Sequence, residues 1–516
     1  MTKLSQLSMR LRKFEPLGFP TFSILIGIEI LTIHGYSLLR FPPPFVDEAW
    51  RASEAWGFIQ SGSWFGPLNR GVLDLIPGYE RFYPWLPTAI QSLGVRLFGV
   101  PDLLAMRFTS LAMGMLLLLA VFSLGNGLAG RQMGLLGLVF TAHSFPFFLS
   151  AHLGRMDVIA AAFGYAGLAL YANNRPAKIW RSALAGLVAA LAFEAHPHAA
   201  IFALTLLALC GLHYRWSLFR KPDFWGFAAG GLVGLLIYLY IHVLPNPQAF
   251  LTLNRLVYFQ THAPPLLTFD LSVIWPVFSD MLLFIAKTYP QAIIALWAVV
   301  RLTKSGPPYW KALLVMNIAL LLGFALFVRN KFLLYYAILF TPALSLLAAA
   351  YFDELLKSPA RSKYETRARQ LIVAAFALLP VLPLLRYNSS PYYQQLQAQV
   401  NQAVRPNDVI MGNQLYWFGL KDHKYSSWEN LVYYRRYRPE SSLEDAFRFL
   451  KPDIFIFDSQ VGNFVFDGER ENLYLQNLQI SATELESFLD RYATLEKTLI
   501  EEDGKPLRIY RINWSD

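Results

Sequence analysis

The chain has little of what a soluble or secreted protein usually contains. Among its 516 residues there is one cysteine, Cys210, which lies in an apolar run, so a disulfide framework and a cysteine-based metal site are both excluded. Only 16% of the residues are charged. The sequence has no phosphate-binding loop, dinucleotide-binding fingerprint or low-complexity tract, and nothing in it predicts a nucleic-acid partner.

What the chain does have is apolar residues, which predict a polytopic membrane protein. They make up 55% of the sequence, and the mean hydropathy of +0.35 is too high for one soluble core of ordinary size. A bilayer core needs roughly 20 apolar residues per helix. Eleven spans are expected, at about residues 20–40, 104–126, 132–152, 157–173, 182–195, 199–213, 224–244, 278–300, 312–327, 332–351 and 371–385.

The distribution of Lys and Arg predicts the orientation of these spans. Basic residues precede the first span, which lacks a small-residue cleavage site and is expected to be retained, and they recur in alternate loops. The positive-inside rule then places the N-terminus in the cytoplasm. A crossing at 84–99 would put every later basic loop outside, so we expect an interfacial helix there, within one long external loop at 41–103.

The composition changes after residue 387, which divides the chain into two predicted domains. Residues 1–387 form the transmembrane domain, and residues 388–516 are expected to form a soluble, extracytoplasmic α/β domain. Strands are predicted at 408–411, 453–457 and 507–512. Two capping-box spacings predict helix starts, and they are Ser441 with Glu444 and Ser481 with Glu484.

Three acidic residues on the predicted external face are candidates for catalysis. Asp47 and Glu48 follow the triple proline at 42–44, where the first apolar run stops, and Asp157 stands between two long apolar runs. If these acids lie on one side of the membrane, they can line one site. The alternative is helix capping, by Asp47 before a plausible helix at 48–60 and by Asp157 at the start of its span.

Several cations are predicted on the same face, where positive charge opposes the expected orientation. They are Arg81, Arg155, Arg329 and Lys331. Cations beside carboxylates at a membrane surface suit a phosphate-bearing amphiphile whose tail stays in the lipid. For Arg329 and Lys331, snorkelling at the end of a span is the alternative.

Histidines mark two further external segments. His196 and His198 lie at a helix break, where they could bind a ligand or simply be satisfied by water and backbone groups. His262 lies in a long loop rich in Tyr, Phe and Pro.

Short motifs follow one another along residues 20–350. They are Val46-Asp47-Glu48, Tyr79-Glu80-Arg81-Phe82-Tyr83-Pro84-Trp85, Leu97-Phe98-Gly99 with Arg107, Arg155-Met156-Asp157, and Asn330-Lys331 through Tyr335-Tyr336 to Pro342. Their order and spacing resemble the GT-C glycosyltransferases, in the branch of lipid A aminoarabinose transferases and protein O-mannosyltransferases. One departure is that Arg-Phe-Tyr-Pro follows Glu80, where the family usually has Lys-Pro-Pro.

The resemblance implies a mainly α, GT-C-like helical bundle and an activity. Such an enzyme moves a sugar, with inversion, from a polyprenyl-phosphate donor to a glycan, lipid or protein acceptor at the outer face of a prokaryotic plasma membrane. By this similarity Asp47 is the general base, and the chemistry agrees, because an attacking hydroxyl needs a carboxylate to take its proton.

The resemblance also implies groups that bind the donor. The departing lipid phosphate needs cations, for which the candidates are Arg81, Arg155, Arg329 and Lys331, with His196 and His198 in support. A divalent metal, Mg²⁺, Mn²⁺ or Zn²⁺, would be held by Glu80 and His262.

Two other classes of protein fit part of the pattern. In a secondary transporter, the acids and histidines would form a substrate or proton pathway near the bilayer midplane. In a non-catalytic scaffold, the membrane part would bind lipid and the terminal domain would recruit partners. The clustering of the acids in loops favours the transferase.

Overall fold

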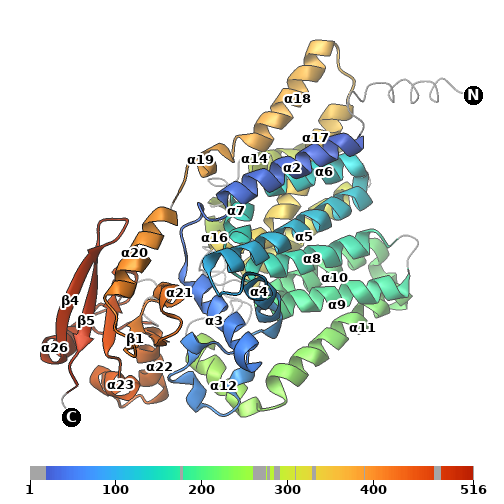
Figure 1. Ribbon diagram of the computed structural model, residues 1–516. Coiled ribbons are helices and arrows are strands. Elements are labelled where there is room, and N and C mark those ends of the chain that lie inside the picture. Colours follow the sequence, from blue (N-terminus) through green and yellow to red (C-terminus); the bar gives the residue numbers. More distant parts are fainter. Residues whose placement is uncertain are drawn as a thin grey trace, which may run out of the picture.

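Residues 19–174, 178–259, 275, 279–283, 291–307, 309–327, 333–388, 390–469 and 478–514 are described by a computed structural model. Most are helical, in a bundle joined to a smaller domain that contains a sheet (Figure 1). The bundle comprises α2 (Phe19–Ser37), α5 (Leu103–Ala129), α6 (Arg131–Ala142), α7 (Phe145–Ala151), α8 (Asp157–Ala172), α9 (Ile179–Ala195), α10 (Ala200–Tyr214), α11 (Pro222–Tyr238), α14 (Gln291–Ser305), α15 (Trp310–Phe327), α17 (Thr341–Lys357) and α18 (Lys363–Leu378). The expected mainly α fold with a C-terminal sheet is confirmed.

The apolar composition explains why these segments are helices. A helix pairs its own backbone groups, which is required where no water is available. In the described part of the chain, four helical segments are long and apolar enough to cross a bilayer, namely Leu103–Ala129, Pro197–Arg220, Pro222–Val243 and Trp310–Phe327. The pair α6 and α7, bent by 68°, would make a fifth. The chain is thus a multi-pass membrane protein, and the number of eleven spans stays a prediction.

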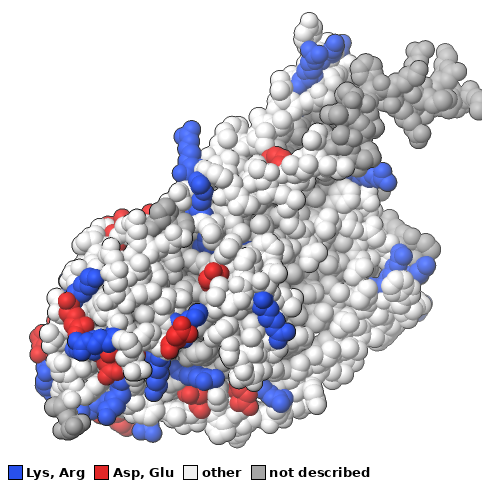
Figure 2. Space-filling model, viewed as in Figure 1, with Lys and Arg blue, Asp and Glu red and all other residues white. Residues whose placement is uncertain are grey.

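The surface separates into a charged and an uncharged region. In Figure 2, Lys, Arg, Asp and Glu crowd over the C-terminal domain and the adjoining loop, whereas the visible face of the bundle is almost free of charge. Such a face is stable only against lipid or another apolar surface.

The segment between α2 and α5 folds into short helices at one end of the bundle. They are α3 (Val46–Ser61), the 3-10 turns η2 (Pro67–Asn69), η3 (Leu73–Leu75) and η4 (Tyr79–Arg81), and α4 (Trp85–Phe98). The helix expected at 84–99 is therefore confirmed. It ends at Gly99, whose φ of 76° is left-handed and closes the last turn. Leu93 and Leu97 are exposed on it, as an interfacial helix requires.

The C-terminal domain holds five strands in the order β2-β1-β3-β5-β4. The strands β2 (Lys424–Ser427), β1 (Val409–Gly412) and β3 (Ile454–Phe457) are parallel neighbours, and β5 (Pro506–Ile512) pairs antiparallel with β3 and with β4 (Ala493–Ile500). The three predicted strands are present within one residue. The other two, β2 and β4, carry few buried side chains and were not predicted.

Helices flank this sheet and connect it to the bundle. They are α20 (Ser390–Gln402), α21 (Trp417–Leu420), α22 (Glu429–Tyr437), α23 (Leu443–Leu450), α24 (Ser459–Gly462) and α26 (Ala482–Tyr492). Ser481 caps α26, as predicted. The other capping box was predicted one residue too early, because Ser442 and Asp445 make the reciprocal bonds at the start of α23.

The C-terminal domain and the loop before α4 share a hydrophobic core. Phe65 and Leu73 of the loop belong to one buried cluster with Trp428 and Phe447 of the domain. Part of α12 (Pro247–Asn254) completes this cluster. Polar contacts fix the register, since Asn430 Nδ2 donates to the Arg70 carbonyl (3.0 Å) and Arg436 Nη1 to the Leu256 carbonyl (2.7 Å). The division of the chain into two domains at residue 387 was predicted from the change in composition, and it stays a prediction.

Glu429 of α22 gives a pH-dependent test of this domain. Burial raises the pKa of its carboxyl from 4.5 to about 7, against opposing hydrogen bonds from Tyr433 and Gln414. Between pH 4.5 and about pH 7, the Glu429 carboxyl binds its proton more tightly in the folded state than in the unfolded state. The contribution of Glu429 to stability therefore falls as the pH rises through this range. Glu429→Gln should therefore raise the thermal unfolding midpoint of the detergent-solubilised protein more at pH 8 than at pH 5. Exposed Glu486→Gln is the control, and an equal effect of Glu429→Gln at both pH values contradicts the assignment.

Candidate active site

A buried ion pair between Glu48 and Arg107 organises the end of the bundle that carries α3 and α4. Arg107 Nε and Nη2 donate to the two carboxylate oxygens of Glu48 at 2.9 and 2.8 Å, and both side chains are fully buried. The remaining Arg107 nitrogen, Nη1, donates to the carbonyls of Leu38 and Pro42 at 3.1 and 3.0 Å. The pair therefore joins α5 to the end of α2 and to the chain that leads into α3.

Glu48 also accepts two backbone hydrogen bonds. Phe45 N donates to Oε2 (3.0 Å), which fixes the start of α3, and Gly154 N donates to Oε1 (2.9 Å). The Gly154 carbonyl accepts from Gln91 of α4 at 3.0 Å. A Cβ at Gly154 would lie 2.7 Å from Met106 Cβ, so only glycine fits between Glu48 and α5. These bonds set the position of the next residues, Arg155 to Asp157.

Arg155 bridges two of the three predicted catalytic acids, Asp47 and Asp157. Its Nε donates to Asp157 Oδ2 at 2.7 Å, and its Nη1 donates to Asp47 Oδ2. Arg155 and Asp157 are buried, whereas the side chain of Asp47 is 35% exposed. Asp47 and Asp157, 110 positions apart in the sequence, thus lie in one cluster at the same end of the bundle.

Neither Asp47 nor Asp157 is the N-cap of its helix, which was the alternative to a catalytic role. Phe45, and not Asp47, is the N-cap of α3, and Asp47 is the second residue of the helix. Asp157 is the first residue of α8 and makes its hydrogen bond to Arg155. Its Oδ1 is buried and has no hydrogen-bond partner within the described part of the chain.

Aromatic rings form the wall behind Arg155. The ring centroids of Phe45, Tyr335 and Tyr336 lie 5.6, 4.6 and 5.9 Å from Arg155 Cζ. Tyr335 and Tyr336 come from α16 (Leu333–Tyr336), so the motif near Tyr335 and the motif at Arg155 meet in space. Cation–π contacts of this kind hold the planar guanidinium in place.

His196 and His198 lie beside the same cluster. His196 Nδ1 accepts from His198 N (3.1 Å), which leaves the ring proton on Nε2, and Nε2 lies 3.9 Å from Asp157 Oδ1. The two rings are 4.5 Å apart, and both contact Tyr336. Burial, with nearby Arg155 and Arg51, lowers the pKa of His196 to about 3, so the ring is neutral at physiological pH.

Glu80 and Arg81 are exposed on η4, and the backbone of Arg81 is hydrogen-bonded to His242. His242 Nδ1 donates to the Arg81 carbonyl at 2.6 Å, and its Nε2 lies 3.0 Å from Glu194 Oε1. The same oxygen of Glu194 accepts from Trp85 N at 3.2 Å. His242 was not predicted as a site residue, although an ionisable residue near the end of an apolar run is a functional signal.

Three of the predicted site residues, His262, Arg329 and Lys331, lie outside the described residues. Within the part that is described, no group of three His, Cys, Asp or Glu side chains is arranged to hold a metal ion. The metal expected at Glu80 and His262 therefore stays a prediction.

Glu54 is a further buried acid that sequence reasoning missed. It accepts from Arg51 (2.6 Å), Asn69 (3.3 Å) and Thr88 (3.4 Å), and burial raises the pKa of its carboxyl. These contacts join α3 to η2 and α4. The sequence gives no signal for the contacts with Asn69 and Thr88 because these partners are 15 and 34 positions away.

The fold of this chain is similar to that of solved GT-C proteins. No family model and no curated protein matches the chain. Among solved structures, ArnT from Cupriavidus metallidurans bound to undecaprenyl phosphate superposes with a TM-score of 0.63 at 14% identity, covering 96% of this chain and 99% of ArnT. The apo state of ArnT gives 0.62 at 15% identity, with the same coverage of both chains.

A second GT-C protein is similar over much of the chain. The archaeal oligosaccharyltransferase AglB from Archaeoglobus fulgidus, in complex with an inhibitory peptide and a dolichol-phosphate, has a TM-score of 0.51 at 12% identity. The match covers 94% of this chain and 74% of AglB. The resemblance seen in the motifs is thus confirmed at the level of the fold.

The Glu48–Arg107 pair predicts strong coupling between two substitutions. Glu48→Gln and Arg107→Met should each destabilise the protein by about 3 to 5 kcal/mol, because each leaves a buried group unpaired. The double variant should lose clearly less than the sum of the two. Unfolding in detergent measures all three, with the partly exposed Glu365–Arg369 pair as a control whose loss should cost far less. Additive losses contradict the coupling.

Gly154→Ala tests the close approach to α5. The added methyl should destabilise the protein by about 1 to 3 kcal/mol, because it overlaps Met106 and moves Arg155. Gly231→Ala in α11 is the matched control, since nothing lies within 4 Å of its Cβ position. Thermal unfolding that is equal for both alanine variants would contradict this packing.

Proposed function

We propose that the protein is a glycosyltransferase of the GT-C fold that uses a polyprenyl-phosphate-linked sugar. The observation that carries the proposal is the Asp47–Arg155–Asp157 cluster, in which a half-exposed carboxylate and a buried one share a guanidinium at one end of the bundle. The fold is that of proteins solved with undecaprenyl phosphate and with a dolichol-phosphate.

Asp47 is the general base in this proposal. Its partial exposure lets an acceptor hydroxyl approach, and its place on a helix fixed by Glu48 holds the carboxylate still. The carboxylate accepts the hydroxyl proton while the oxygen bonds to the anomeric carbon, and the bond from that carbon to the lipid phosphate breaks with inversion.

Asp157 and Glu48 act by positioning. Asp157 orients Arg155, and its unpaired Oδ1 faces the neutral His196 ring. All of the hydrogen bonds of the Glu48 carboxylate go to protein groups, so Glu48 holds the loop geometry on which Asp47 and Arg155 depend.

The charge of the cluster supports the need for further cations. Arg155 carries one positive charge and faces two carboxylates, and His196 is neutral. A departing lipid phosphate needs additional positive charge. Arg81, Arg329 and Lys331 are the proposed sources, with a divalent metal at Glu80 and His262 as a further one. An AglB structure in complex with Zn and sulfate is consistent with a metal.

The proposed setting is the outer face of a prokaryotic inner membrane. The N-terminus is cytoplasmic, and the C-terminal domain is extracytoplasmic and packs on the loop that carries the site. The acceptor is a glycan, a lipid or a protein hydroxyl.

Asp47→Asn tests the role of the base. Release of polyprenyl phosphate from polyprenyl-phosphate sugars should fall by about 10²-fold or more, because the amide cannot take the proton, while binding of the donor persists. Asp102→Asn, at the N-cap of α5, should leave release unchanged because asparagine caps as well as aspartate.

The opposite outcomes are equally informative. Unchanged turnover by Asp47→Asn removes Asp47 as the base. No turnover by the wild type with any donor, together with proton-coupled uptake in vesicles, indicates a transporter.

A further inference from the structure

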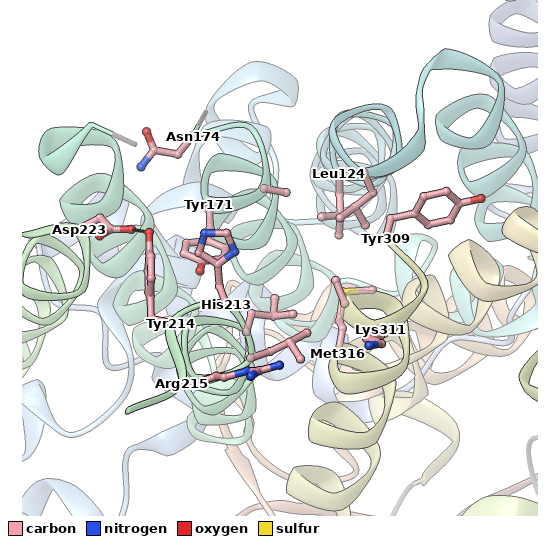
Figure 3. A pocket seen from close by; sticks show the side chains of 15 residues that line it. Leu124, Tyr171, Asn174, His213, Tyr214, Arg215, Asp223, Tyr309, Lys311 and Met316 are labelled. Carbon is pink, nitrogen blue, oxygen red and sulfur yellow. Dashed lines mark hydrogen bonds between the residues drawn. The ribbon is translucent and has the colours of Figure 1, made fainter. Parts of the chain in front are cut away.

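A pocket of about 720 Å³ opens at the end of the bundle away from the Asp47 cluster (Figure 3). Its walls come from the C-terminal ends of α5, α8 and α10 and from the N-terminal ends of α11 and α15. Asp157 begins α8, and Asn174, just past the end of the same helix, lines the pocket. At 1.5 Å per residue, the 16 residues of α8 separate the two sites by about 24 Å.

Helix pairing explains why a pocket forms here. α5 packs along α8, and α10 packs along α15. The pocket lies where these two pairs separate, and its apolar part is lined by Leu124, Leu128, Leu209, Leu212 and Met316.

Two basic residues line the polar part. In Figure 3, the side chain of Arg215, at the end of α10, points toward the side of the pocket where Lys311 of α15 lies. Neither has an ion-pair partner among the residues that the structure describes. The carboxylate in the lining is Asp223, which accepts a hydrogen bond from Tyr214, so the fixed charges of the pocket are net positive.

The backbone at Arg215 is held in a rare conformation. Its φ of 48° with ψ of −131° is unfavourable for a residue with a side chain. Such strain persists only where the surrounding structure imposes it, and it occurs frequently at ligand sites. Here it directs a guanidinium into the pocket.

Exposed aromatic residues beside the pocket support a position at the level of lipid headgroups. Trp216 and Phe219, beside Arg215, are 100% and 67% exposed, and Trp225 at the start of α11 is 57% exposed. Exposed Trp side chains at the ends of apolar helices are typical of the membrane–water interface. A lipid of that leaflet can therefore enter the pocket without leaving the membrane.

We propose that this pocket binds the headgroup of an anionic phospholipid. Arg215 and Lys311 bind the phosphate, Tyr309 and His213 border it, and the leucines and Met316 contact the start of the acyl chains. Basic pockets between membrane helices bind anionic headgroups for these reasons. The site is independent of the proposed transfer reaction, and its ligand is a structural or regulatory lipid.

The test uses the full-length protein in nanodiscs that contain equal amounts of phosphatidylglycerol and phosphatidylcholine with identical acyl chains. Native mass spectrometry after transfer to detergent counts the lipids retained. The wild type should retain phosphatidylglycerol about thirtyfold over phosphatidylcholine, as two basic residues near the surface predict. Arg215→Gln with Lys311→Gln should reduce this preference strongly.

A matched variant separates the pocket from general surface charge. Arg131→Gln with Arg220→Gln removes two exposed basic residues at the same end that do not line the pocket, and it should keep the preference. Equal loss in both double variants, or no preference in the wild type, overturns the proposal. So does displacement of the lipid by excess inorganic phosphate, which would indicate a soluble anion.

Discussion

The structure at the end of the bundle that carries α3 and α4 depends on one buried ion pair, Glu48 with Arg107. Two charges removed from water are costly unless every hydrogen-bonding group is satisfied, and here the guanidinium and the carboxylate each bind backbone groups as well as each other. The requirement for complete pairing allows only one arrangement of α2, α3, α5 and the loop at Gly154. The pair therefore contributes to the geometry of this end more than to its net stability.

That geometry creates the cluster around Arg155. Because Gly154 is fixed by Glu48 and Gln91, the next residue points between Asp47 and Asp157, and the aromatic rings of α16 cover its other face. The result is a carboxylate that is partly open to water beside a buried cation. Positioning of this kind is what a general base on a membrane surface requires, since an exposed and mobile carboxylate would be both solvated and misplaced.

The two ends of the bundle differ in how they use charge. At the end that carries Asp47, acids and cations are paired, and the C-terminal domain shares a hydrophobic core with the loop before α4. At the opposite end, Arg215 and Lys311 are exposed and line a pocket whose other walls are largely apolar. The two ends of the bundle thus present chemically different surfaces.

The sequence by itself determined the helical membrane class, the C-terminal sheet and the segment that holds Asp47, because apolar runs, strand composition and motif order are local properties of the chain. It also selected Asp157 and Arg155. Only the tertiary structure decided that Arg155 bridges Asp47 and Asp157 and that the Glu48 carboxylate pairs with Arg107. It also decided that His242, which contacts Glu194, binds the Arg81 carbonyl. These contacts join residues from 48 to 161 positions apart, and the pairing of buried polar groups over such distances is set by helix packing, which no local pattern contains.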